Sequence, residues 1–132
     1  MTIFIFGNQD LPQDNLAFLI SKKLENLPGV NFKSVDPNGD LPISGNGQIN
    51  IIDTIMGIDK VTLLTEKDLN QLVLSPRTTA HDYDLGFQLK YLTKIGRLKK
   101  VNVIGLPMNG KINYDLIHSI LRKLVAQDIQ GS

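Results

Sequence analysis

The 132-residue sequence predicts an α/β fold, a three-layer α/β/α sandwich around a five-stranded, mostly parallel sheet. Short apolar runs of strand length alternate along the chain with amphipathic segments of helical spacing. One run, Gln48–Ile55, is nearly all apolar between Ile49 and Ile52, as expected for a strand covered on both faces. The connection at Gly57–Lys60 is too short for a crossover helix, so the strand that follows it should be an antiparallel edge strand. The length suits a single domain over 1–132.

The first half of the chain predicts a strand, a helix and a second strand. Residues 2–6 form the first apolar run. The helix that follows carries apolar residues at helical spacing (Leu16, Leu19, Ile20, Leu24 and Leu27) and ends at Pro28-Gly29. Residues 30–36 alternate apolar and polar side chains, which predicts a more exposed strand. The loop after it is rich in Gly, Pro, Asn and Asp and lacks the Gly-Lys-Ser/Thr ending of a phosphate-binding loop.

The second half predicts three strands and two helices. The strand at 48–55 is followed by a turn at Gly57–Lys60 and a strand at 61–65, most simply as an antiparallel edge hairpin. A helix follows with an apolar stripe closed by Gly96 (Leu85, Leu89, Leu92 and Ile95). The strand "KVNVIGLP" then leads to a last helix, opened by Asn113 or Asp115. The predicted order is β-α-β-β-β-α-β-α.

Composition excludes several classes of function. The net charge of +1 favours neither a nucleic-acid nor a membrane partner. The chain has no cysteine, which excludes disulfides, thiolate metal sites and a cysteine nucleophile. The start "MTIFIFGNQD" has no basic region, and its apolar run is too short for a signal peptide. No run approaches the roughly 18 apolar residues of a membrane span. A cytoplasmic protein is therefore expected.

The candidate site comes from polar residues that follow predicted strands. Asp14 lies in the loop after the first strand, Asp53 near the end of the third, and His81 in the loop before the second long helix. Ligands of such sheets bind beyond the carboxyl ends of the strands. Two carboxylates and an imidazole with open coordination positions suit a divalent metal or a polarised water. Gly7 and Asn8 would shape the turn that leaves the first strand.

Each of these residues also has a structural interpretation. Asp14 or Asn15 can cap the helix that begins at Leu16. Asp53 can form a salt bridge or a hydrogen bond to a loop, since an unpaired carboxylate in a buried strand costs several kcal/mol. His81 can be a surface or hydrogen-bonded histidine. The sequence leaves both interpretations open.

The order of these features resembles the hydrogenase maturation proteases. These endopeptidases remove the C-terminal extension of the large subunit of nickel–iron hydrogenases. The resemblance extends from Thr2 to about Val125. It consists of a first strand ending in Gly7-Asn8, an Asp six residues after that Asn, a buried strand ending in Asp53, and the loop "TTAH" before a helix.

The resemblance implies a function and the residues that perform it. The family's two acidic metal ligands correspond to Asp14 and Asp53, and its histidine corresponds to His81. They would recognise nickel, or a substitute divalent ion, already loaded into the hydrogenase large-subunit precursor. The metal would belong to the substrate. Hydrolysis would be metal-assisted and non-covalent, because neither a Cys nucleophile nor a Gly-x-Ser-x-Gly elbow is present. Asp14 and Asp53 could each be ligand or general base.

The sequence departs from the family in its first loop. The family has an acidic pair followed by glycine, whereas this chain has Gln13 in place of the first acid and Asn15 in place of the glycine. Two alternatives therefore stay open. One is a catalytically inactive binding or regulatory domain of the same fold, and the other is an unrelated small α/β hydrolase or binding protein that shares only the architecture.

Overall fold

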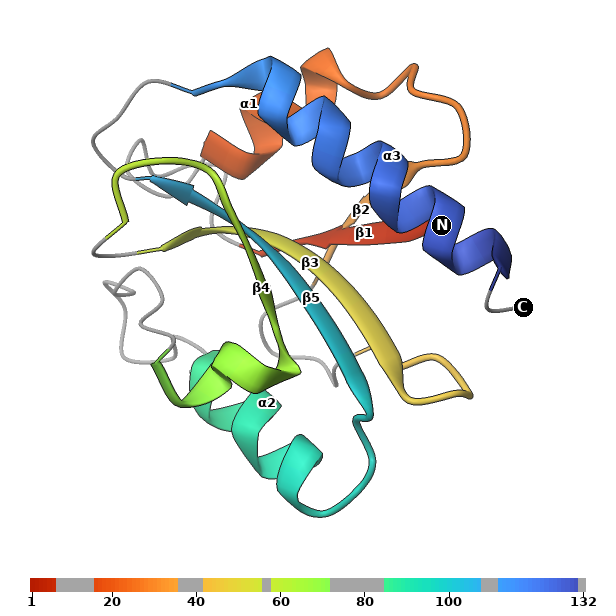
Figure 1. Cartoon of the computed structure of the whole chain (residues 1–132), viewed down its shortest axis with the longest axis vertical. Coiled ribbons are helices and arrows are strands. Elements are labelled where there is room, and N and C mark those ends of the chain that lie inside the picture. Colours follow the sequence, from red (N-terminus) through yellow and green to blue (C-terminus); the bar gives the residue numbers. More distant parts are fainter. Residues whose placement is uncertain (7–15, 36–41, 56–57, 72–84, 108–111, 131–132) are drawn as a thin grey trace.

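A computed structural model describes residues 1–6, 16–35, 42–55, 58–71, 85–107 and 112–130. Its elements alternate between sheet and helix, as Figure 1 shows: β1 (Thr2–Ile5), α1 (Leu16–Lys23), β2 (Asn31–Ser34), β3 (Gln48–Ile55), β4 (Thr62–Thr65), the 3₁₀ helix η2 (Glu66–Gln71), α2 (Leu85–Lys94), β5 (Lys100–Pro107) and α3 (Tyr114–Gln130). β3 and β5 have the bounds that the sequence predicts, and α3 extends further than predicted.

The five strands form one sheet in the order β2-β1-β3-β5-β4. β1 pairs in parallel with β2 and β3, β3 pairs in parallel with β5, and β4 pairs antiparallel with β5. The predicted fold class, including the antiparallel edge strand, is therefore confirmed. The sequence interpretation of β4 as the partner of a hairpin with β3 is wrong, because β5 lies between the two strands.

Burial explains why β5 takes the place beside β3. Seven of the eight residues of β5 are buried, as are seven of the eight residues of β3. The two strands pair along their whole length, from Gln48 opposite Lys100 to Ile55 opposite Pro107. The residues of β4 are only partly buried, which suits an edge position. Placing β4 beside β3 would have moved the apolar β5 to the edge.

Helices cover both faces of the sheet, as Figure 1 shows. On one face, Ile3, Ile5, Ile52 and Ile104 belong to the same buried cluster as residues of α1 and α3. On the other face, the neighbouring residues of the same strands pack with α2 and η2, and this cluster includes Ile49, Ile51, Ile55, Val101, Val103, Leu69, Leu89 and Leu92. Alternate residues of each strand thus supply two separate cores.

The 3₁₀ helix η2 is an element that the sequence interpretation missed. Asp68 Oδ2 accepts a hydrogen bond from the Thr65 N–H at 2.8 Å, and Thr65 Oγ1 accepts one from the Lys67 N–H at 3.4 Å. This reciprocal pattern is a variant of the capping box in which the Lys67 N–H, two residues after the cap, is the donor; its sequence signal is the spacing Thr-x-x-Asp in "TEKD".

Within the described ranges, no helix has the length and apolar character that a bilayer span requires.

Candidate functional site

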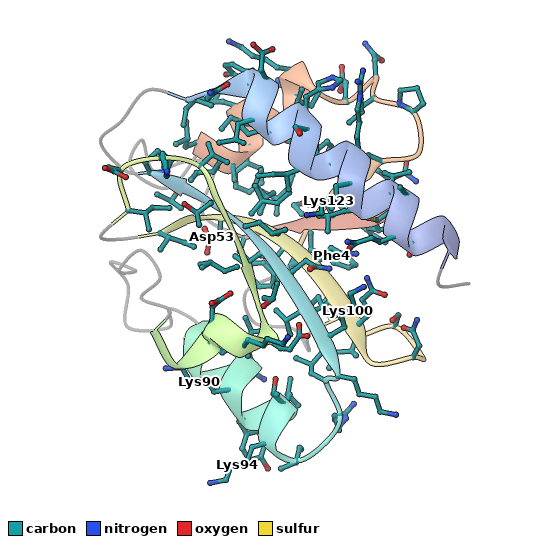
Figure 2. The ribbon with its side chains drawn as sticks, viewed as in Figure 1. Phe4, Asp53, Lys90, Lys94, Lys100 and Lys123 are labelled. Carbon is teal, nitrogen blue, oxygen red and sulfur yellow. The ribbon has the colours of Figure 1, made fainter. Side chains whose placement is uncertain are left out.

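Asp53 lies near the carboxyl end of β3, at the centre of the sheet. Figure 2 shows it close to the arrowhead of that strand, whereas Lys100 marks the opposite end of the sheet. Its side chain is fully buried, at 0% exposure. Asp53 Oδ1 accepts a hydrogen bond from the Thr54 N–H at 2.8 Å, which orients the carboxylate. Burial of a carboxylate costs several kcal/mol unless bonds offset it, so this position is unusual for an acid in a sheet core.

The neighbours of Asp53 across the sheet come from β1 and β5. Asp53 is in register with Gly105 of β5. On the other side, the N–H of Phe6, which directly follows β1, donates to Ile52 O at 3.4 Å. Because residues alternate between the faces of a strand, Asp53 lies on the same face as Ile51 and Ile55. That is the face covered by α2.

Gly105 has a steric role beside the acid. A Cβ atom at this position would overlap Ile55 Cδ1 and would lie 3.3 Å from Ile58 Cδ1. The side chain of Ile55 therefore extends over the backbone of the neighbouring strand. The residue registered with Asp53 on β5 contributes backbone without a side chain, so the sequence signal "VIGLP" has a packing reason.

The topology places Asp53 where α/β sheets bind their ligands. β1 connects through α1 to β2 on one side, and the chain then returns to β3 on the other side of β1. The strand order therefore reverses between β1 and β3, and ligand sites of open α/β sheets lie beyond the carboxyl ends at such a point. Phe6 leads into residues 7–15 from this same edge of the sheet.

The other predicted site residues lie outside the described residues. Asp14, His81, Gly7 and Asn8 belong to residues 7–15 and 72–84, so their predicted roles stay predictions. Of the predicted site residues, the structure describes Asp53, which lies near the carboxyl end of β3 with its side chain buried. Among the residues it describes, no three His, Cys, Asp or Glu side chains are grouped so as to hold a metal ion. A carboxylate such as Asp53 is nonetheless an oxygen donor suited to a divalent cation.

Thr54, which the sequence interpretation missed, is a further polar residue near the carboxyl end of β3. Its side chain is 1% exposed, and within the described part of the chain its Oγ1 forms no hydrogen bond. A buried hydroxyl without a partner costs about 1–3 kcal/mol. Strand alternation places it on the face opposite Asp53. The sequence signal was a hydroxyl residue within the apolar run "INIIDTI".

His118, the second histidine of the chain, lies on the opposite side of the sheet from Asp53. It is half-buried on α3, where it lines a surface pocket with Asp115, Ser119 and Arg122. α3 packs on the face of Ile52 and Ile104, and Asp53 lies on the other face. The sheet therefore separates the two side chains.

Comparison of the chain with protein-family models, with curated proteins and with solved structures gave no match. The assignment of a function therefore depends on the residues and their placement.

Proposed function

We propose that this protein is an endopeptidase that removes the C-terminal extension of a nickel-loaded hydrogenase large-subunit precursor. The proposal rests on the sequence resemblance together with one observation. Asp53 is a fully buried carboxylate at the carboxyl end of the central strand β3, beside the point where the strand order reverses. An acidic side chain buried at this position of an α/β sheet is typical of a site where its charge is used.

The proposed chemistry is hydrolysis by an activated water. The substrate's metal would polarise the carbonyl of the scissile bond, and a carboxylate would take the proton of the attacking water. Asp14, Asp53 and His81 would recognise the metal, and one of the two aspartates would act as general base. The hydrogen bond from the Thr54 N–H supports this role for Asp53, because it fixes the orientation of the carboxylate.

The direct test is incubation of the protein with a nickel-loaded precursor, followed by mass spectrometry. Wild-type protein should shorten the precursor. Asp53→Asn should lower the rate of cleavage about 100-fold or more, because a neutral amide neither takes up a proton nor binds a cation as a carboxylate does. Asp59→Asn is the matched control, since it makes the same change at an exposed aspartate and should leave the rate unchanged.

A nickel titration tests the three residues as one site. Asp14→Ala, Asp53→Ala and His81→Ala should each bind nickel more weakly than wild type. Equal affinity in all four proteins would contradict the proposal.

The altered loop "QDN" favours a second candidate, a binding or regulatory domain of the same fold without activity. It requires that the protein bind the precursor and leave its mass unchanged. A mass shift of the precursor would exclude this candidate.

A further inference from the structure

The strand β2 lies at an edge of the sheet that the structure describes. Among the strands that the structure describes, its partner is β1 alone. The Asn31 N–H donates to Met1 O at 2.8 Å, and the Val35 N–H donates to Ile5 O at 3.2 Å. Because backbone groups of successive strand residues point to opposite sides, Phe32 and Ser34 direct their N–H and C=O groups away from β1. Within the described residues, these outward groups have no hydrogen-bond partner.

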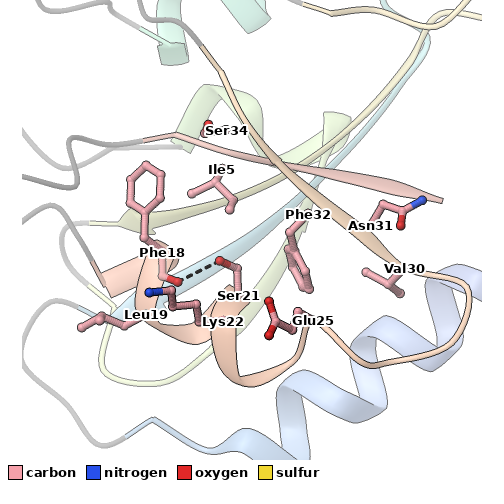
Figure 3. Close-up of a pocket in the computed structure, with 10 residues that line it drawn as sticks. All are labelled: Ile5, Phe18, Leu19, Ser21, Lys22, Glu25, Val30, Asn31, Phe32 and Ser34. Atoms are coloured by element: carbon pink, nitrogen blue, oxygen red, sulfur yellow. Dashed lines mark hydrogen bonds between the residues drawn. The ribbon is translucent and has the colours of Figure 1, made fainter.

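A groove lies next to this edge, between α1 and β2, and is called here the α1–β2 groove. It has a volume of about 630 Å³, within the usual range of ligand pockets. Its apolar lining includes Phe18 and Leu19 of α1, Phe32 of β2 and the adjacent Val30, all labelled in Figure 3. Leu19 is 52% exposed, which is high for a leucine on a helix that covers a sheet. The groove therefore offers unburied apolar surface beside backbone groups that no described residue pairs.

The charges of the groove are balanced. Lys22 and Glu25 both line it, and Figure 3 shows the Lys22 amine near Phe18 and the Glu25 carboxylate near Phe32. A groove with one charge of each sign suits a peptide, because peptide N–H groups can donate to the Glu25 carboxylate and peptide carbonyl groups can accept from the Lys22 amine. It does not suit the uniform negative charge of a nucleic acid or of an anionic membrane.

We propose that the α1–β2 groove binds an extended peptide segment of a partner protein. The segment adds to the sheet as a further strand and forms hydrogen bonds with the backbones of Phe32 and Ser34. Because side chains of a strand alternate between faces, every second residue of the segment faces the groove. Apolar side chains at those positions contact Phe18, Leu19 and Phe32.

A second copy of this chain fits the edge less well than a peptide does. An antiparallel pairing of two β2 strands that uses both Phe32 and Ser34 centres on Lys33. It places Lys33 directly opposite Lys33 of the other copy, and like charges in that position are destabilising. The proposed partner is therefore a segment without a basic residue at that position.

The test measures amide hydrogen exchange in the full chain by NMR. The probes are three blocked peptides, acetyl-Thr-Xaa-Thr-Xaa-Thr-amide, in which Xaa is Val, Leu or Phe. At a peptide concentration nine times Kd, exchange of the Phe32 and Ser34 amides should slow about tenfold, because exchange then requires release of the peptide. The Asn31 and Lys33 amides, which face β1, should keep their rates. Absence of slowing with all three peptides overturns the proposal.

N-methylated peptides test the strand geometry. Only one alternating set of peptide N–H groups can face β2, so methylation of one set should abolish the slowing and methylation of the other set should preserve it. Equal behaviour of the two methylated peptides overturns the proposal. Protection of Phe32 and Ser34 without peptide, accompanied by a dimer in light scattering, also overturns it in favour of a second copy.

A matched pair of variants tests the apolar wall. Leu19→Ser should weaken binding of the probe peptide about fivefold, as expected for the loss of a half-buried aliphatic contact. Ile95→Ser removes an aliphatic side chain of 50% exposure that lies outside the groove, and it should leave binding unchanged. Equal weakening by both overturns the proposal. The groove opens on the face of α1 and α3, whereas Asp53 faces α2, so the outcome is independent of the cleavage assay.

Discussion

Asp53 and Gly105 lie side by side on β3 and β5, one with a buried carboxylate and the other without a side chain. Ile55 occupies the space above Gly105, so the three residues form one packing unit at the carboxyl end of the sheet. Close packing of this kind transmits the effect of a single methyl group to its neighbours.

A double-mutant cycle should reveal this unit. Gly105→Ala should lower the free energy of unfolding by about 1–3 kcal/mol, because its methyl group overlaps Ile55 Cδ1. Ile55→Val removes that Cδ1 atom, so Gly105→Ala should cost about 1 kcal/mol less in the Ile55→Val background. Urea denaturation of the four proteins measures the coupling. Additive effects of the two substitutions would contradict the packing described.

The last helix, α3, begins with a cap that the sequence left undecided between Asn113 and Asp115. The structure selects Asn113, because its Oδ1 accepts the Leu116 N–H at 3.0 Å and its backbone oxygen accepts the Ile117 N–H at 3.2 Å. Asp115 lies in the first turn, where its negative charge is favourable near the helix N-terminus. Both residues thus stabilise the same helix end in different ways.

Two substitutions of Asn113 should differ in their effect on the stability of the protein. Asn113→Ala should lower the free energy of unfolding by about 1 kcal/mol, since the Leu116 N–H loses its acceptor. Asn113→Asp keeps an acceptor at the same place and should leave the stability within about 0.5 kcal/mol of wild type. Thermal denaturation distinguishes them, and equal stability of the two variants would show that the cap contributes nothing measurable.

The assembly of the whole sheet includes a buried polar pair between its two longest strands. Asn50 of β3 and Asn102 of β5 are in register, and Asn102 Nδ2 donates to Asn50 Oδ1 at 2.9 Å. Gln48 Nε2 also approaches this oxygen at 3.4 Å. A pairing shifted by one residue would turn these amides to the other face. The pair therefore favours a single register of β3 against β5.

Removal of either amide of this pair should lower the free energy of unfolding by more than half of the loss caused by removing both. Asn50→Ala and Asn102→Ala should each destabilise the protein, because each leaves a buried amide with fewer hydrogen bonds. The double variant should be more stable than the sum of the two effects predicts, by about 1 kcal/mol. Chemical denaturation of the three variants and wild type provides the comparison. Agreement with the sum would mean that the two amides act independently.

The sequence predicted much of the architecture and part of the site. Its apolar runs gave the bounds of β3 and β5, and the short connection after β3 indicated an antiparallel edge strand. It also placed Asp53 at the carboxyl end of a buried strand, as the structure confirms. It missed η2, whose capping box is a short polar signal among apolar patterns, and it missed the hydrogen bond between Asn50 and Asn102.

By itself, the sequence determined which segments become strands and helices, because the spacing of apolar residues is a local property of the chain. It also determined the charge balance and the absence of thiol chemistry. Tertiary structure alone decided that β5 lies between β3 and β4, that Gly105 is the neighbour of Asp53, and that a groove opens between α1 and β2. These features depend on contacts between residues far apart in the chain, and apolar burial is not directional enough to specify them from sequence.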